Sequence, residues 1–99
     1  MQSPKCNSLE EVRAAVDALD DKIVELIALR NSYIKQAANF KESVEDVKAP
    51  DRIEFVIQKV RKKALEYNLS PNLIEDIYKM MIEEMVNTEI AEFRDTKGF

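Results

Sequence analysis

Histidine and tryptophan are absent from this sequence, which contains one cysteine, one glycine and three prolines. The single thiol, Cys6, cannot form an internal disulfide, so nothing in the cysteine content requires an oxidising compartment. Without histidine and with one thiol, the chain lacks the usual ligands of transition metals, and we predict no metal site. The scarcity of glycine and proline leaves few of the turns that a β-sheet needs. These absences favour an all-α fold.

The sequence also lacks long apolar runs and an excess of basic residues. No window approaches the roughly 20 apolar residues of a membrane-spanning helix, and the polar residues 1–7 do not resemble a signal peptide. The net charge is −4 and the isoelectric point lies near 4.9. Nucleic acids and anionic membranes are bound through basic surfaces, so the acidic composition argues against both as partners. We expect a cytoplasmic protein.

Apolar residues at helical spacing dominate what is present, with 45% hydrophobic and 34% charged residues among 99. This length predicts a single domain, residues 1–99 with a core of about 8–93. The first helix is predicted to begin at a capping box, in which the Ser8 hydroxyl accepts from the Glu11 amide and the Glu11 carboxylate accepts from the Ser8 amide. Its apolar seam consists of Leu9, Val12, Val16, Leu19, Ile23, Leu26, Tyr33, Ala37 and Phe40.

The predicted first helix, from Ser8 to Phe40, is about 50 Å long. One chain of this size cannot cover an apolar seam of that length, so the seam predicts a homodimer. Residues 42–49 lose the stripe and are predicted to be a connection, which ends where Pro50 pushes Ala49 out of helical geometry.

Two further helices are predicted after the connection. Pro50 or Asp51 begins the second, which has a stripe of Ile53, Val56, Ile57, Val60 and Ala64 and a solvated side of Lys59, Arg61, Lys62 and Lys63. The second helix is predicted to end and the third to begin within Tyr67–Pro71, with Asn68 in a left-handed conformation and Ser70 as the cap of the third helix. The third helix is predicted to run to about Phe93, with one face formed by Ile74, Ile77, Tyr78, Met81, Met85 and Thr88, and residues 95–99 are predicted to fray.

A cation interrupts the apolar seam of the first helix at Arg30. A buried guanidinium is costly unless a negative group meets it. Lys41 is almost three helical turns further on, about 16 Å away on the same side, so the two side chains could converge on one ligand. Arg13 lies about 42 Å from Lys41. It can join the same site only if a second copy of the helix runs antiparallel, which again predicts a dimer.

Arginine presents a planar fork that matches a carboxylate, so this set of cations suits a small dicarboxylate. Glu89 lies one turn past Met85, on the edge of the third helix's apolar stripe, and is a candidate for the remaining polar contact. Two states are open for Glu89. It is either an anion held by arginine or a carboxylic acid kept neutral by desolvation and able to donate a proton.

Over roughly residues 8–93 the chain resembles the all-helical chorismate mutase family. The resemblance is carried by Leu9-x-x-Val12-Arg13-x-x-Val16-Asp17-x-x-Asp20, Ile23-Val24-x-Leu26-x-x-x-Arg30, Lys41, Asp51-Arg52 and Ile82-Glu83-Glu84-Met85-Val86-x-Thr88-Glu89. It implies an intertwined homodimer with three helices per chain and two equivalent sites. It also implies that the two carboxylates and the ether oxygen of chorismate are held by Arg30, Lys41 and Arg52 of one chain and Arg13 of the other.

The reaction implied by the resemblance is the pericyclic rearrangement of chorismate to prephenate, which needs no cofactor, metal or nucleophile. Lys41 and a protonated Glu89 would stabilise negative charge on the ether oxygen in the transition state. Two departures from the mutase pattern stand out. Ile53 follows Arg52 where many mutases carry a glutamate that holds a substrate hydroxyl, and Glu89 stands where well-known bacterial enzymes carry a glutamine.

Shorter matches resemble the isochorismate-pyruvate lyase branch of the family, which forms salicylate and pyruvate. They are Ser3-Pro4-x-Cys6, Ala37-Ala38-x-Phe40-Lys41, Val47-x-Ala49-Pro50-x-Arg52 and Thr96-Lys97-Gly98. The sequence therefore predicts a chorismate mutase first and this lyase second. A non-catalytic helical dimerisation or regulatory module is the third interpretation, in which Arg30 fixes helix register and the other candidate residues are ordinary surface charges.

Overall fold

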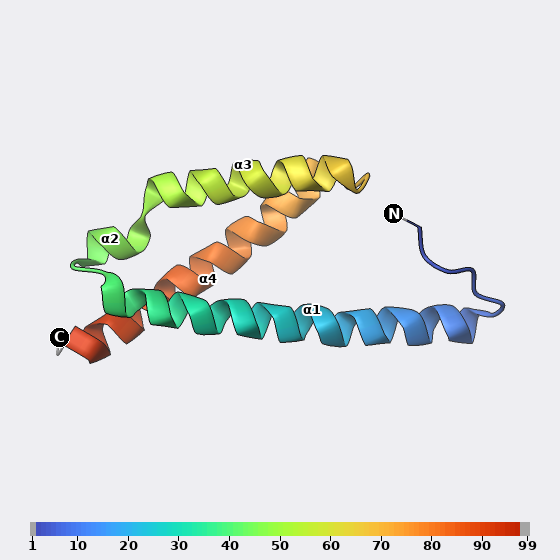
Figure 1. The fold of residues 1–99 in the computed structure, drawn as a ribbon, viewed down its shortest axis with the longest axis horizontal. Coiled ribbons are helices and arrows are strands. Elements are labelled where there is room, and N and C mark those ends of the chain that lie inside the picture. Colours follow the sequence, from blue (N-terminus) through green and yellow to red (C-terminus); the bar gives the residue numbers. More distant parts are fainter. Residues whose placement is uncertain (1, 98–99) are drawn as a thin grey trace. The chain divides into compact units, whose positions relative to one another are not determined.

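The computed structural model describes residues 2–97, and in that range it contains helices joined by turns and irregular segments, with no strand. Its elements, in order, are α1 (Leu9–Ala37), the 3-10 helix η1 (Ala38–Phe40), α2 (Val44–Lys48), α3 (Pro50–Glu66) and α4 (Pro71–Lys97) (Figure 1). The predicted all-α class and the three long helices are confirmed. Two compact units make up the chain, Met1–Tyr33 and Ile34–Phe99. Across residues 2–97, every helix is too short or too polar to cross a membrane.

The start of α1 follows the predicted cap with one change. The Glu11 amide donates to the Ser8 hydroxyl at 3.1 Å, as predicted. The Glu11 carboxylate, however, accepts from the amide of Asn7 at 2.7 Å rather than from that of Ser8. A glutamate side chain is long enough to reach one residue further back, and the amide of Asn7 lies outside the helical hydrogen-bond ladder. Two hydrogen bonds therefore cap the helix, one between Glu11 and Ser8 and the other between Glu11 and Asn7.

The apolar seam of α1 is open to solvent in the single chain. No residue of α1 is buried, and its large seam side chains range from 43% exposed at Val12 to 63% exposed at Tyr33, while Ala37 is half-buried. Burying one large aliphatic side chain stabilises a protein by about 1.5–3 kcal/mol. Burial of this exposed seam against a partner helix would therefore add substantially to the stability of the protein.

The far end of α1 differs from the prediction. The α-helix ends at Ala37, and Ala38–Phe40 form a tighter 3-10 turn. Ala38 is fully buried and packs in a small core with Val47 and Phe93. Packing at Ala38 fixes this last turn, and Phe40 is consequently 84% exposed instead of continuing the seam.

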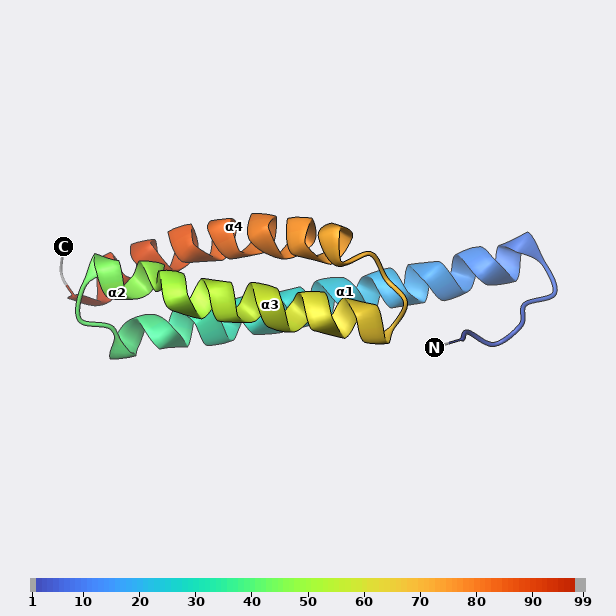
Figure 2. The same cartoon turned by 90° about the horizontal axis from the view of Figure 1, so that it is seen from above.

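The connection predicted for residues 42–49 contains the short helix α2. Ser43 caps it by accepting from the Asp46 amide at 3.1 Å, and Ala49 ends it in the left-handed conformation, with φ 34° and ψ 63°. The displacement of Ala49 from helical geometry before Pro50 is as predicted. Val47 anchors α2 in the small core, and α2 lies beside the C-terminal part of α4, as the view from above shows (Figure 2).

The turn between α3 and α4 agrees with the prediction. Asn68 adopts a left-handed conformation with φ 60°, and the Ser70 hydroxyl accepts from the Leu73 amide at 3.2 Å. The chain reverses here, and α4 packs against α3. The predicted stripe of α3 faces this contact, with Ile57 and Ala64 buried.

The buried face of α4 is displaced from the prediction. Its buried residues are Ile82, Met85, Glu89 and Phe93, whereas Ile77, which was predicted on that face, is 48% exposed. The helix continues to Lys97, so residues 95–97 are helical rather than frayed, and residues 98–99 lie outside the described range. Packing of α2 and η1 against the extended C-terminal half explains why the face lies further along the helix.

Candidate functional site

Lys41 and Glu89 meet in the second unit. Lys41 is the first residue after η1 and has extended backbone geometry, with φ −94° and ψ 149°. Glu89 projects from α4 toward it, and the Lys41 Nζ lies 3.5 Å from the Glu89 Oε2. The exposed fraction of the side chain is 26% for Lys41 and 6% for Glu89. The pair therefore combines a partly accessible cation with an almost inaccessible carboxyl group.

Two features of its surroundings act on the pKa of Glu89 in opposite directions. Glu89 is buried, not at the edge of the apolar face as predicted. Apart from the 3.5 Å contact with Lys41, which exceeds ordinary hydrogen-bond length, its Oε2 has no polar partner among residues 2–97. Burial raises the pKa of the Glu89 carboxyl, and the positive charge of Lys41 opposes this increase to a smaller extent. A buried carboxyl with a raised pKa is suited to donate a proton or a hydrogen bond. Of the two states left open by the sequence, burial shifts the balance toward the acid, relative to an exposed glutamate.

The Lys41 ammonium also contacts the backbone of α2. Its Nζ donates to the carbonyl oxygen of Asp46 at 3.0 Å. An ammonium carries three N–H donors, so these two contacts leave capacity for a further acceptor. Lys41 is thus held between α2 and α4 while part of its side chain still reaches solvent.

Arg52 lies in the first turn of α3 and is exposed. Its guanidinium sits over the ring of Phe55, with 5.2 Å between the guanidinium carbon and the ring centroid, which is a cation–π geometry. Among residues 34–97, it forms no hydrogen bond or ion pair with Lys41 or Glu89. Stacking on Phe55 occupies one guanidinium face and leaves the in-plane N–H donors with the geometry that binds carboxylates.

Arg13 and Arg30 belong to the first unit, on α1. Arg13 is exposed and Arg30 is half-buried. The structure therefore brings Lys41 and Glu89 together, leaves Arg52 apart from them in the same unit, and carries the two remaining predicted cations on the other unit.

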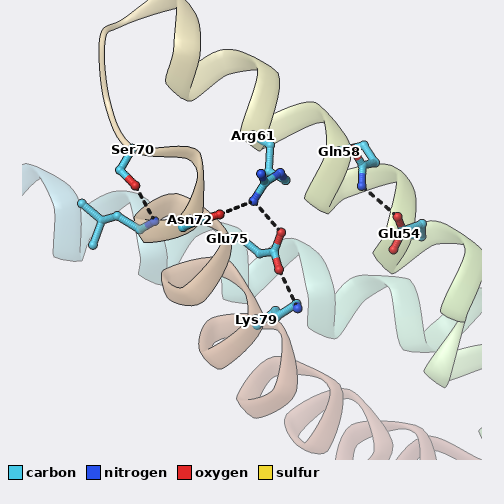
Figure 3. Close-up of polar contacts among 8 residues, drawn as sticks. Glu54, Gln58, Arg61, Ser70, Asn72, Glu75 and Lys79 are labelled. Atoms are coloured by element: carbon cyan, nitrogen blue, oxygen red, sulfur yellow. Dashed lines mark hydrogen bonds and ion pairs between the residues drawn. The ribbon is translucent and has the colours of Figure 1, made fainter.

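A separate charged cluster joins the start of α4 to α3 (Figure 3). The Arg61 guanidinium donates to Asn72 Oδ1 at 3.0 Å and to Glu75 Oε1 at 2.8 Å. The Lys79 ammonium lies 2.6 Å from Glu75 Oε2. Lys79 and Arg61 together hold the pKa of the Glu75 carboxyl below its ordinary value. Arg61 was predicted on a solvated side, and it is half-buried because Asn72 and Glu75 contact its guanidinium.

Sequence reasoning overlooked Ser43 and Asp46, which shape the connection next to Lys41. Their spacing is that of a helix N-cap and its third helical residue, and Val44 and Val47 provide an apolar pair on one side of a single turn. Both signals are present in the sequence, but they are short. The end of the apolar stripe of the first helix favoured a connection over residues 42–49 instead.

The sequence of the chain is similar to known proteins of one family. The chain matches the chorismate mutase type II family over residues 12–90. It is similar to an isochorismate pyruvate lyase of Pseudomonas aeruginosa, with 29% identity over 99% of this chain and 98% of that protein. A chorismate mutase of Methanocaldococcus jannaschii is 34% identical over 76% of this chain and 77% of that protein. A bifunctional chorismate mutase/prephenate dehydratase of Buchnera aphidicola is 31% identical over 87% of this chain but 23% of its own length.

The family match includes all of α3 and most of α1 and α4, and it contains Arg13, Arg30, Lys41, Arg52 and Glu89. The two relatives of similar length align with most of this chain. With its all-helical architecture, the chain belongs to the chorismate mutase type II family.

Proposed function

We propose that this protein is a chorismate mutase, which converts chorismate to prephenate. The observation that carries the proposal is the Lys41 ammonium placed 3.5 Å from a buried carboxyl group, Glu89, whose pKa is raised by burial. Membership of the chorismate mutase type II family supplies the reaction class.

The rearrangement is unimolecular and requires no group that attacks the substrate. As the ether bond of chorismate breaks, negative charge develops on its oxygen. The ammonium of Lys41 and the acidic proton of Glu89 can both donate to that oxygen, and a site that excludes water makes such interactions stronger. Catalysis consists of holding the substrate in its reactive conformer and stabilising this charge.

The substrate's two carboxylates require cations, and Arg13, Arg30 and Arg52 have the planar donor geometry for that task. In our proposal Arg30 and Arg52 come from the same chain as Lys41, and Arg13 comes from a second copy. The open seam on α1 supports this arrangement, because a homodimer with antiparallel α1 helices would bury the seam and bring Arg13 of one copy toward the site of the other.

An isochorismate-pyruvate lyase is the second candidate function. It is favoured by the Pseudomonas aeruginosa relative, whose alignment includes almost the full length of both chains. Elimination of pyruvate from isochorismate also cleaves an ether bond and so could use the same donors. A non-catalytic dimerisation module is the alternative from another class.

Product analysis distinguishes the three functions. Purified protein is incubated with chorismate and, separately, with isochorismate, and the products are identified by chromatography. Prephenate from chorismate is the expected result, whereas salicylate and pyruvate from isochorismate would assign the lyase. The Lys41→Ala variant, purified in the same way, controls for contaminating enzymes. A folded dimer that converts neither substrate would overturn the enzymatic proposal and leave the module.

A further inference from the structure

The segment that follows Lys41 is closed by hydrogen bonds that meet at Asp46. The Asp46 carboxylate Oδ2 accepts from the Glu42 amide at 3.1 Å. The Asp46 amide donates to the Ser43 hydroxyl at 3.1 Å, and the Asp46 carbonyl oxygen accepts from the Lys41 Nζ at 3.0 Å. One residue therefore contacts the backbone next to Lys41, the cap of α2 and the Lys41 ammonium itself.

The residue after Asp46 fixes this arrangement to the rest of the unit. Val47 is 2% exposed and packs with Ala38 and Phe93 in the small core. Phe93 lies one helical turn beyond Glu89 on the buried face of α4. The Asp46 carbonyl is thus next to Val47, and Val47 packs against the part of α4 that carries Glu89.

The Asp46 carboxylate itself is bonded to the Glu42 amide and not to Lys41. The ion pair of Lys41 is with Glu89. Asp46 therefore acts on Lys41 through backbone geometry: its side chain closes the turn, and the closed turn aims its carbonyl oxygen at the ammonium.

We propose that Asp46 is a positioning residue, which holds the Lys41 ammonium beside Glu89 by closing the 41–46 turn. The proposal rests on the proposed function, since it concerns a residue that we expect to contact the substrate. Without the turn, the lysine side chain would be free to adopt other rotamers, and its ammonium would spend less time beside the reacting oxygen.

The first test compares turnover of three variants with the wild type. Asp46→Ala removes the acceptor for the Glu42 amide, whereas Asp46→Asn keeps an acceptor oxygen and removes the charge. Glu45→Ala is the matched control, because it removes an acidic side chain from the same turn, one that is 83% exposed and paired with Lys48 at 3.5 Å. We expect Asp46→Ala to lower kcat about tenfold or more with little change in KM. Asp46→Asn and Glu45→Ala should remain near the wild type.

The second test measures the Glu89 carboxyl without any substrate. Among residues 2–97, Lys41 is the charged group that acts on the Glu89 pKa, and it lowers that pKa. If Asp46→Ala releases Lys41 from Glu89, the pKa of Glu89 should rise above its wild-type value. Titration followed by carbon-13 NMR of labelled glutamate, with the Glu89 signal assigned from its absence in Glu89→Gln, reports the shift. A residue that only stabilised α2 would lower the melting temperature and leave this pKa unchanged.

The outcomes separate the positioning role from the proposed function. The proposal is supported if Asp46→Ala has a lower kcat and a raised Glu89 pKa while Asp46→Asn keeps the kcat of the wild type. Equal behaviour of Asp46→Ala and Glu45→Ala overturns it, and so does an equal loss in Asp46→Asn, which would assign the effect to charge. If the wild type converts neither chorismate nor isochorismate, the proposed function fails, and the NMR titration alone decides whether Asp46 positions Lys41.

Discussion

The Glu89 carboxyl is subject to two opposed influences. Burial disfavours its anion and raises its pKa, while the Lys41 ammonium favours the anion and acts less strongly. At a given pH more of the carboxyl is protonated than in an exposed glutamate, whose pKa is near 4.5. If the acid form is the active one, the useful protonation state exists below the raised pKa and is lost as pH rises through it.

We therefore predict that wild-type kcat falls as pH increases through the pKa of Glu89. The Glu89→Gln variant should show a flat profile, because an amide donates a hydrogen bond at every pH, and it should exceed the wild type at the alkaline end. The measurement is kcat against pH in buffers of constant ionic strength. Glu84→Gln, an exposed position on the same helix, should keep the wild-type profile.

An alkaline decline that is equally steep in Glu89→Gln would contradict this role for Glu89. The decline would then belong to another group.

At the scale of elements, α4 is fixed near both of its ends. Near its start, Arg61 of α3 donates to Asn72 and Glu75. Near its other end, η1 and α2 pack on it through Ala38 and Val47. Glu89 lies close to the second attachment, so its position depends on how α2 and η1 dock as well as on α4.

Removal of the first attachment should have a modest effect on stability. We expect Arg61→Ala to lower the melting temperature by roughly 2–4 °C, because partly exposed ion pairs stabilise weakly. The difference from the wild type should shrink at high salt, which screens the pair. Thermal unfolding monitored by circular dichroism measures both effects.

Lys62→Ala is the control for this experiment, since Lys62 is the exposed neighbour of Arg61 on α3. A melting temperature equally reduced in both variants would show that the cluster does not tie α3 to α4.

The long helices could be predicted because their boundaries are encoded locally. Ser8, Pro50 and Ser70 with the following proline each restrict the backbone within a few residues. The 3-10 turn and α2 were not predicted, because their geometry depends on Ala38 and Val47 packing against Phe93, about 50 residues away in the chain.

The same distinction applies to the site. The family resemblance identified Lys41 and Glu89 as candidates. The prediction that Lys41 lies on the same helix as Arg30, on the same side, is wrong, because the α-helix ends at Ala37 and Lys41 has extended geometry. The burial of Glu89 could not be predicted, because it depends on which face of α4 is covered by η1 and α2. The partners of Arg61 could not be predicted for a similar reason, since Asn72 and Glu75 lie beyond the turn.

At the scale of the whole molecule, the seam of α1 predicts self-association. Ile23 lies in the middle of the seam and is 53% exposed in the single chain. For the proposed homodimer, we expect Ile23→Glu to shift the protein from dimer to monomer, because the interface would then bury two carboxylates in apolar surroundings. Analytical ultracentrifugation measures the change.

Ala28→Glu introduces the same residue on the same helix, at an exposed position away from the seam, and should leave the dimer intact. Equal masses for the two variants would show that the seam is not the dimer interface.

A shared site makes a sharper prediction about the dimer. If Arg13 serves the site of the partner and Arg30 serves its own, then Arg13→Ala and Arg30→Ala should each abolish turnover while leaving a folded dimer. After subunit exchange between the two variants, a heterodimer has one site in which both arginines are intact. With random exchange, half of the dimers carry one such site, so an equal mixture should recover about a quarter of wild-type activity.

The mixture of Arg30→Ala with Lys41→Ala is the matched control, because both substitutions fall in the part of the site that one chain supplies. Neither site of that heterodimer is intact, and no activity should return. Subunit exchange is verified in both mixtures by native mass spectrometry. Recovery in neither mixture, once exchange is verified, would contradict a site shared across the dimer. Equal recovery in both would show instead that exchange restores activity without placing Arg13 opposite Arg30.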